Sequence, residues 1–263
     1  MFPKEHGAWN ALILSMAVGW TWLGHFDVAA LWASLAWSAG FLSQRPFRLT
    51  IQYHKADKSK AKKALFLFLI EAAVALIAGF FFLREASEPS RRWALEVAFP
   101  LAATLGLLFL WRRTLRFLAA ELLGFVFLCL LAPILGLNVP DIGEEKALWL
   151  FFLLSGYFLT TVFYVRLRRK WFLASREKPR LPFPMRLKEG WRLIILQILF
   201  LGVAFFCPHG KALVILGAAE SFLKTTLGLL AGKPSLPLMK LGLREMIYSL
   251  LFALLIGAAF KNF

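Results

Sequence analysis

The sequence lacks the motifs of soluble enzymes. It contains no Walker loop, no glycine-rich dinucleotide turn, no HExxH string and no G-x-S-x-G string. The four histidines are scattered, with none four residues from another and none deep in an apolar run, which argues against a bis-histidine haem site. The two cysteines, Cys129 and Cys207, lie in apolar context and are interpreted as packing residues. No soluble catalytic class is therefore indicated.

Repeats and targeting segments are absent as well. There is no repeat with a period of about 20–50 residues, no low-complexity tail and no separate soluble domain. The first apolar run begins at residue 8 and lacks a small-residue cleavage site. We therefore expect a retained helix there and not a signal peptide.

Hydrophobic residues are abundant instead. They make up 60% of the chain, compared with about 45–50% in soluble domains, and they include 27 Phe and 10 Trp. They form runs of roughly 16–22 residues, the length that a helix needs to cross about 30 Å of hydrocarbon. Backbone amides in lipid must be paired within the segment, and the alternating polarity of membrane β-strands is absent. The sequence therefore predicts an all-α integral membrane protein.

Nine apolar runs predict nine transmembrane helices in a single polytopic domain, residues 1–263. The predicted helices are 8–24, 27–43, 64–84, 93–111, 116–136, 147–165, 191–207, 212–231 and 243–260. Nine crossings place the two termini on opposite sides of the membrane.

Basic residues fall mostly on one side of this topology. That side contains the N-terminus and the segments 44–63, 111–116, 166–192 and 224–244, and it carries 25 of the 31 Lys and Arg. Because Lys and Arg are enriched in cytoplasmic loops, we expect a multi-pass protein of the inner (cytoplasmic) membrane with its N-terminus inside and its C-terminus outside. The formal charge of +16 then reflects this bias and contact with anionic lipid headgroups, and nucleic acid is not an expected partner.

Five acidic residues lie inside the apolar runs, where a charge is costly and often functional. They are Glu71, Glu96, Glu121, Glu220 and Glu245. Three of them, Glu71, Glu121 and Glu245, are predicted to share the cytoplasmic third of the membrane with Lys224 and Arg244. This distribution favours a polar cavity that opens to the cytoplasm.

Structural ion pairs are the alternative for each of these acids. Glu220 lies four residues before Lys224, the spacing of a pair on one helix face. By the same reasoning Glu121 has Arg112 or Arg116 as a candidate partner, and Glu96 has Arg92.

The segment before the first helix, residues 3–9, reads P-K-E-H-G-A-W. Lys4, Glu5 and Trp9 are typical of a helix start at a membrane surface. His6 is not required for that role. An imidazole at this boundary can bind a phosphate or exchange a proton near neutral pH.

Two basic segments are richer in charge than topology requires. In 44–63, Arg45 and Arg48 lie three residues apart beside the membrane, where they can form a fork for a phosphate or diphosphate. The segment 166–192 begins with Arg166 and continues into an apolar stretch broken by prolines, 181–185, which predicts an interfacial lid. Binding of lipid headgroups is the alternative for both segments.

The string P-K-E-H-G-A-W resembles the hallmark of the YwiC-like family of bacterial membrane proteins. Further matching residues are Ala120-Glu121-Leu122, Gly124 and Ala132-Pro133 in the fifth predicted helix, and the residues from Thr161 to Arg166 at the end of the sixth. The resemblance runs the whole length of the chain. It implies a bacterial membrane protein without naming a reaction.

The topology is more distantly similar to that of the UbiA-type prenyltransferases. That resemblance implies nine helices and active-site loops after helices two and six, where this chain has its two largest basic segments. In that family aspartate-rich motifs bind magnesium and a prenyl diphosphate. Here Asp57 is the only acid in 44–57, and Arg166, Arg168 and Arg169 occupy the later segment. Two Mg²⁺ ions need several carboxylate oxygens, so the sequence indicates no magnesium site and no other cofactor.

Three functions remain open at this point. The first is binding or transfer of an isoprenoid or other lipid phosphate, with Arg45, Arg48 and Arg166 on the phosphate and with Glu71, Glu121 or His6 in catalysis. The second is a secondary transporter that uses Glu220 and Lys224, or Glu71. The third is an accessory subunit of a larger membrane complex. Further substrate-binding candidates are Lys4, Glu5, Lys224, Arg244 and Glu245.

Overall fold

The computed structural model describes residues 6–54, 56–112, 118–140, 142–174, 183–230 and 238–261. Within these ranges the chain is helical, and no strand is present. The chain divides into two compact units, unit 1 (Met1–Ala147) and unit 2 (Leu148–Phe263).

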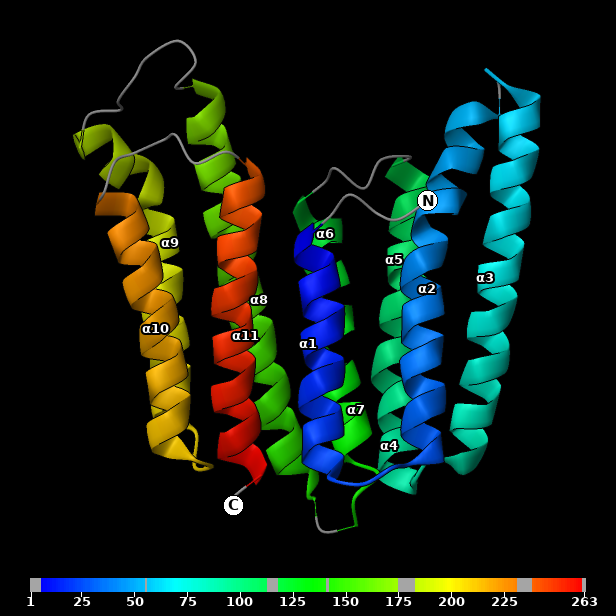
Figure 1. Cartoon of the computed structure of the whole chain (residues 1–263), viewed down its shortest axis with the longest axis horizontal. Helices are drawn as coiled ribbons and strands as arrows, with labels where there is room; N and C mark the ends of the chain where they lie inside the picture. The colour runs from blue at the N-terminus through cyan, green and yellow to red at the C-terminus, as the bar shows by residue number, and fades with distance from the viewer. Residues whose placement is uncertain are drawn as a thin grey trace. The chain divides into compact units, whose positions relative to one another are not determined.

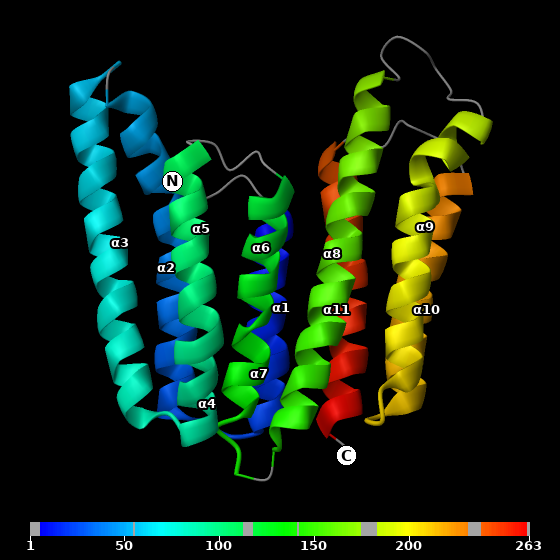
Figure 2. The ribbon, with the colours of Figure 1, turned by 180° about the vertical axis from the view of Figure 1, so that it is seen from behind.

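Nine helical segments lie in the described ranges, and Figures 1 and 2 label the α-helices from two opposite sides. They are α1 (His6–Leu23), α2 (Val28–Tyr53), α3 (Lys58–Glu85), the continuous run of α4 (Glu88–Trp93), η1 (Ala94–Ala98) and α5 (Phe99–Arg112), the pair α6 (Leu118–Cys129) and α7 (Leu131–Gly136), α8 (Glu144–Ala174), α9 (Phe183–Phe206), α10 (Lys211–Leu230) and α11 (Leu238–Lys261). They correspond one to one to the nine predicted segments, which confirms the all-α fold.

Several helices extend beyond their predicted ends. α2 continues through residues 44–53, so Arg45 and Arg48 lie on a helix, and α3 already begins at Lys58. α8 continues to Ala174, so Arg166 is helical too. The predicted loops 44–63 and 166–192 were therefore wrong in extent, because helical hydrogen bonding continues after hydropathy falls. Of the predicted lid, residues 183–185 form the first turn of α9, and residues 181–182 lie outside the described ranges.

Five helices among the described residues are long and apolar enough to cross a membrane. They cover Lys58–Glu85, Glu144–Phe172, Pro184–Phe206, Lys211–Leu230 and Lys240–Lys261, and shorter apolar helices cover Ala8–Leu23 and Glu121–Gly136. Large side chains on α3, such as Phe66, Leu76 and Phe80, are 64%, 74% and 64% exposed. A continuous apolar surface of this kind suits lipid and not water. The chain is therefore a membrane protein.

The interior of unit 1 contains α7, whose residues are all buried. α1 packs along α6 and α7 so closely that the Trp22 ring contacts Gly136, where a β-carbon would collide with it. α4 also contacts α7, and the Ser90 hydroxyl donates to the Ile134 carbonyl at 2.8 Å. The short helix thus pairs its polar groups with side chains of its neighbours.

α2 and α3 form an antiparallel pair in unit 1, side by side in Figure 1. One face of α3 carries buried and half-buried residues that are spaced alternately three and four apart, the pattern of a packed seam. They are Ala61, Ala64, Phe68, Glu71, Ala75, Ala78 and Phe82. The Phe47 and Phe68 rings, with centroids 4.9 Å apart, set the register of the two helices. Glu71 therefore lies in the middle of the seam.

Asp57, the acidic residue of the predicted active-site loop, caps α3. The backbone amide of Lys60 donates to Asp57 Oδ1 at 3.1 Å, and Lys60 Nζ lies 3.1 Å from Oδ2. These contacts, the backbone hydrogen bond first, hold the pKa of the Asp57 carboxyl below its ordinary value. Asp57 therefore acts as the N-cap of α3.

Unit 2 contains α9, α10, α11 and all but the first turn of α8. α10 packs against both α9 and α11. Glycines permit two close approaches: Gly156 of α8 faces the Phe200 ring of α9, and Gly217 of α10 faces the Phe252 ring of α11. The four helices therefore share one interior.

Replacing Ala78 by Phe tests the seam between α2 and α3. Ala78 is fully buried, so the larger side chain must displace its neighbours, and we expect the free energy of unfolding to fall by about 1–3 kcal/mol. Ala73 lies on the exposed face of the same helix, and Ala73→Phe is expected to change that free energy by less than about 0.5 kcal/mol. Unfolding of the purified protein in detergent measures both. Equal effects of the two substitutions would contradict the assigned faces.

Candidate functional site

The predicted site residues divide between the two units. Unit 1 contains Arg45 and Arg48 on α2, Glu71 on α3 and Glu121 on α6, and unit 2 contains Arg166 on α8, Lys224 on α10 and Arg244 and Glu245 on α11. His6 is the first residue of α1, and its side chain lies outside the described part of the chain, as do Lys4 and Glu5 entirely.

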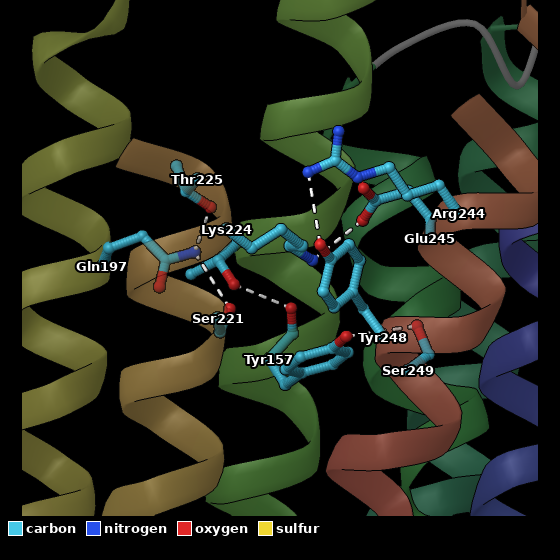
Figure 3. Close-up of polar contacts among 10 residues, drawn as sticks. Tyr157, Gln197, Ser221, Lys224, Thr225, Arg244, Glu245, Tyr248 and Ser249 are labelled. Carbon is cyan, nitrogen blue, oxygen red and sulfur yellow. Dashed lines mark hydrogen bonds and ion pairs between the residues drawn. The ribbon is translucent and has the colours of Figure 1, made fainter. Parts of the chain in front are cut away.

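Lys224 and Glu245 form a buried ion pair in unit 2. Lys224 Nζ donates to Glu245 Oε2 at 2.8 Å, and the two side chains are only 1% and 5% exposed. The pair joins α10 to α11, as Figure 3 shows. Removing two charges from water is expensive, so such a pair persists only where the geometry is good and further contacts surround it. The neighbouring side chains supply those contacts.

Three tyrosine rings enclose the Lys224 ammonium. Its nitrogen lies 5.2 Å from the ring centroid of Tyr157, 5.8 Å from that of Tyr164 and 5.3 Å from that of Tyr248. All three distances fall within the range of about 6 Å over which a ring face attracts a cation. Tyr157 and Tyr164 come from α8, and Tyr248 follows Glu245 on α11. We call these three rings and the Glu245 carboxylate the Lys224 cage.

Tyr157 is fixed by contacts with α11. The Phe252 ring stacks on it with the ring centroids 4.0 Å apart. The Tyr157 hydroxyl donates to Ser249 Oγ at 3.3 Å, a contact visible in Figure 3. Both the face and the hydroxyl of this ring are therefore constrained, which limits its movement around the ammonium.

Tyr164 and Tyr248 are fixed in other ways. The Tyr164 hydroxyl occupies the space beside Gly228 of α10, where a β-carbon would collide with it. Arg244 Nη2 donates to the Tyr248 hydroxyl at 3.2 Å, and its guanidinium carbon lies 5.3 Å from the same ring centroid. Arg244 therefore supports the cage from outside and does not pair with Glu245.

Glu220 brings a second carboxylate to this interior. It lies one turn before Lys224 on α10, and both of its carboxylate oxygens are buried without a hydrogen-bond partner among the described residues. Glu245 Oε1 is likewise buried without a hydrogen-bond partner among the described residues. A carboxylate without donors in a low-dielectric interior is costly when it is ionised. The site therefore contains two carboxylates for one enclosed ammonium, and it has the capacity to take up a proton.

Gln197 of α9 bonds the residues on either side of Lys224. Its Nε2 donates to Ser221 Oγ at 3.1 Å and to Thr225 Oγ1 at 3.0 Å. The Gln197 side chain approaches α10 from the side opposite Tyr248 in Figure 3. Its Oε1 is buried and has no hydrogen-bond partner in the described ranges. All four helices of unit 2 thus contribute to one polar interior.

Two pairings considered from sequence are wrong. Lys224 pairs with Glu245 of α11 and not with Glu220, because helical spacing identifies a shared face but not the neighbouring helix. Arg92 pairs with Glu144, whereas Glu96 lies on an exposed face. Glu96 belongs to the π-helical turn η1, whose wider winding alters the spacing between it and Arg92.

Basic residues of the segment 166–192 bond the end of α10. Arg168 Nη1 donates to the Gly228 carbonyl at 3.0 Å, and Arg186 Nη1 donates to the carbonyls of Leu229 and Leu230 at 2.9 and 2.7 Å. The last carbonyls of a helix have no partner within it, so these guanidiniums cap the helix. These contacts explain part of the charge in a segment for which we considered a phosphate site.

Unit 1 contains a smaller set of candidate site residues. Arg45 and Arg48 are half-buried on α2, and the Phe47–Phe68 contact places their turn beside the turn of α3 that precedes Glu71. One Glu71 oxygen, Oε2, is buried without a hydrogen-bond partner in the described part of the chain. Glu121 is half-buried in the first turn of α6. Unit 1 thus gathers two guanidiniums and one carboxylate along the α2–α3 pair.

Residues 2–136, just over half of the chain, match the YwiC-like protein family. The chain belongs to the YwiC-like family. No curated protein and no solved structure matches it. The match confirms the family resemblance over a region of unit 1 that contains P-K-E-H-G-A-W and Glu121, and it does not extend to the residues from Thr161 to Arg166. The Lys224 cage of this YwiC-like protein lies outside the matched region.

Sequence reasoning identified the charged residues of the cage and missed its rings. The YwiC-like chain has 27 Phe and only 4 Tyr, and Tyr157, Tyr164 and Tyr248 are three of the four. In an apolar interior Phe is the default ring, so a Tyr marks a position where a hydroxyl finds a partner or a ring faces a cation. This scarcity was the signal in the sequence that could have located the cage.

Lys224→Met in the YwiC-like protein tests the ion pair. The substitution preserves side-chain length but leaves Glu245 buried without its cation, so the free energy of unfolding is expected to fall by about 3–5 kcal/mol. Adding Glu245→Met is expected to restore most of this loss, because no unpaired charge remains at the contact. Thermal unfolding in detergent measures the variants, with Lys240→Met at an exposed position as control. A double variant as unstable as the single one would contradict the pair.

Proposed function

We propose that this YwiC-like protein is a proton-coupled secondary transporter that crosses the inner membrane nine times. The observation that carries the proposal is the buried Lys224–Glu245 pair of unit 2, with the carboxylate of Glu220 one turn away and without a hydrogen-bond partner in the described chain. Ionisable groups inside a membrane bundle are expensive and mark ion or proton pathways.

The charges of the site support coupling to protons. Within the cage, two ionised carboxylates face one ammonium, and the next cation, Arg244, lies outside the cage on Tyr248, so the second negative charge has no cation in contact with it. A proton on Glu220 removes that charge. A second ligand that changes the local charge therefore changes the affinity of Glu220 for its proton. By the same linkage the proton changes the affinity of the site for that ligand, and this couples the two transported species.

The topology supports entry from the cytoplasm. The excess of Lys and Arg favours an N-terminus inside and a C-terminus outside. With nine crossings, the Leu230 end of α10 then faces the cytoplasm. A helix rises about 1.5 Å per residue, so Lys224 lies about 9 Å and Glu220 about 15 Å from that end. A proton that enters from the cytoplasm therefore passes the turn of Lys224 and reaches Glu220 one turn further along α10.

A second candidate function is binding of an isoprenoid or other lipid phosphate in unit 1. Arg45 and Arg48 are half-buried and one turn apart on α2, beside the part of α3 that leads to Glu71. Two guanidiniums at this spacing suit a phosphate or diphosphate. Unit 2 favours this function less, because Arg168 and Arg186 are bonded to carbonyls of α10.

Proteoliposomes that contain a pH-sensitive dye test the transporter. A pH gradient is imposed, and cations, anions, amino acids and sugars are added outside one class at a time. We expect at least one class to move protons across wild-type vesicles, and we expect Glu220→Gln to abolish this movement because an amide cannot carry the proton. Glu88→Gln, at an exposed position, is the matched control. Proton movement that is unchanged in Glu220→Gln would refute the role of this carboxylate.

Lipid co-purification tests the second candidate. Mass spectrometry of the purified protein is expected to detect a bound lipid or isoprenoid phosphate if unit 1 binds one, and Arg45→Ala with Arg48→Ala is expected to remove it. Lys62→Ala with Lys63→Ala deletes two exposed cations on α3 and is expected to retain it. The same bound lipid in wild type and in the arginine variant would exclude this site.

A further inference from the structure

The Lys224 cage has the composition of a binding site for an ammonium cation. Ring faces and a carboxylate are the groups that recognise quaternary and alkylated ammonium ligands in proteins. Here the enclosed cation is the side chain of Lys224, whose nitrogen lies 2.8 Å from Glu245 Oε2 and within 5.8 Å of three ring centroids. We propose that the cage is the substrate site of the transporter, that Lys224 occupies it when no substrate is bound, and that the substrate is an ammonium-type organic cation.

This inference rests on the proposed transport function and adds the class of substrate. The remaining polar atoms around the cage support a cation. Glu245 Oε1, Gln197 Oε1 and both Glu220 oxygens are buried and accept no hydrogen bond from the described residues. All four are acceptors, so they attract a positively charged ligand and disfavour a phosphate or a carboxylate.

Two cations cannot occupy the cage together. Like charges in van der Waals contact repel strongly where water is excluded, so an arriving cation requires Lys224 to become neutral or to leave. The titratable and charged groups around Lys224 are Tyr157 and Tyr164 from α8, Glu220 from α10, and Arg244, Glu245 and Tyr248 from α11, while α9 contributes the neutral Gln197. Of these, Glu220 is the carboxylate without a bonded cation among the described residues.

The exchange at Lys224 therefore requires a proton transfer. Glu220 first releases its proton to the cytoplasmic side, and its carboxylate then accepts one proton from the Lys224 ammonium, which becomes a neutral amine. The incoming cation takes the place of the ammonium against Glu245 and the ring faces. One positive charge leaves and one arrives, so the charge of the interior is unchanged and the two species move in opposite directions.

The backbone around Lys224 can stay in place during this exchange. Gln197 bonds Ser221 and Thr225, which flank Lys224 on α10, and so anchors that turn to α9. The lysine side chain is a flexible four-carbon stem. It can withdraw from the rings by rotation about its own bonds while the carboxylate and the ring faces remain available to the substrate.

Choline, its neutral isostere 3,3-dimethylbutan-1-ol and sodium ion are the probes that test the assignment. Choline has a permanent charge, so it cannot cross the vesicle membrane as a neutral base. In wild-type proteoliposomes we expect an inward choline gradient to drive protons outward, and we expect no response to the isostere or to sodium. Calorimetry of the wild-type protein in buffers of different ionisation enthalpy is expected to show that choline binding releases a proton.

Variants of the cage sharpen the test. Tyr248→Leu removes one ring face, and the half-saturating choline concentration is expected to rise about fivefold to thirtyfold, the effect of one cation–π contact. Tyr248→Phe retains the face but loses the hydrogen bond from Arg244, so a smaller rise than for Tyr248→Leu is expected. Phe206→Leu, at an exposed ring of α9 outside the cage, is the matched control, and no change is expected. If the Tyr248 variants do not fold, proton release on choline binding by wild type still decides the question.

The outcomes separate this inference from the function on which it rests. Proton movement driven by an anion or a neutral solute, or by sodium alone, with no response to choline overturns the cation assignment and leaves the transporter intact. If none of the solute classes drives proton movement, both the cation assignment and the transporter are overturned. Equal responses to choline and to its isostere also overturn the assignment, because they show that charge is not recognised.

Discussion

A charge that is removed from water must be neutralised where it lies, and this requirement governs the interior of unit 2. Lys224 on α10 is almost completely buried, so it needs a carboxylate, which α11 provides through Glu245. The ammonium faces rings from α8 and α11, and Gln197 of α9 bonds the residues on either side of it. Side chains of α8 and α11 thus surround one charge, and α9 anchors the turn of α10 that carries it. The packing of unit 2 and its candidate chemistry are therefore properties of the same residues.

Unit 1 satisfies its polar groups by a different arrangement. The helical segment that comprises α6 and α7 is interrupted at Leu130, and an interrupted helix in an apolar environment must have its carbonyls paired by neighbouring groups. The Trp37 indole donates to the Phe127 carbonyl at 3.2 Å, and the Ser90 hydroxyl donates to that of Ile134. These contacts pair neutral groups on both sides of the break. Unit 1 is thus stabilised by backbone pairing, whereas unit 2 contains an ion pair within its interior.

The sequence was sufficient to identify the class of fold, because hydrophobic runs of membrane-spanning length report the helices directly. It was insufficient for helix ends, since α2 and α8 continue through Arg45 and Arg166 after hydropathy has fallen. It identified Lys224 and Glu245 as separate intramembrane charges but not as partners, because which helices are neighbours is a tertiary property. The roles of Arg168 and Arg186 depend on the end of α10 lying beside α8 and α9, and no pattern along the chain encodes that proximity.

The two arginine caps also determine how α10 can move. At its C-terminal end the helix is bonded by guanidiniums from two different helices, and at its start Gly210, with φ of +52°, lies directly against the backbone of Ala259. Sliding or turning α10 would break charge-assisted hydrogen bonds at one end and cause a steric collision at the other. The motion that remains is rotation of side chains within the frame, whereas helix displacement takes microseconds or longer. Exchange at Lys224 would then be gated by a rotamer change in a rigid frame.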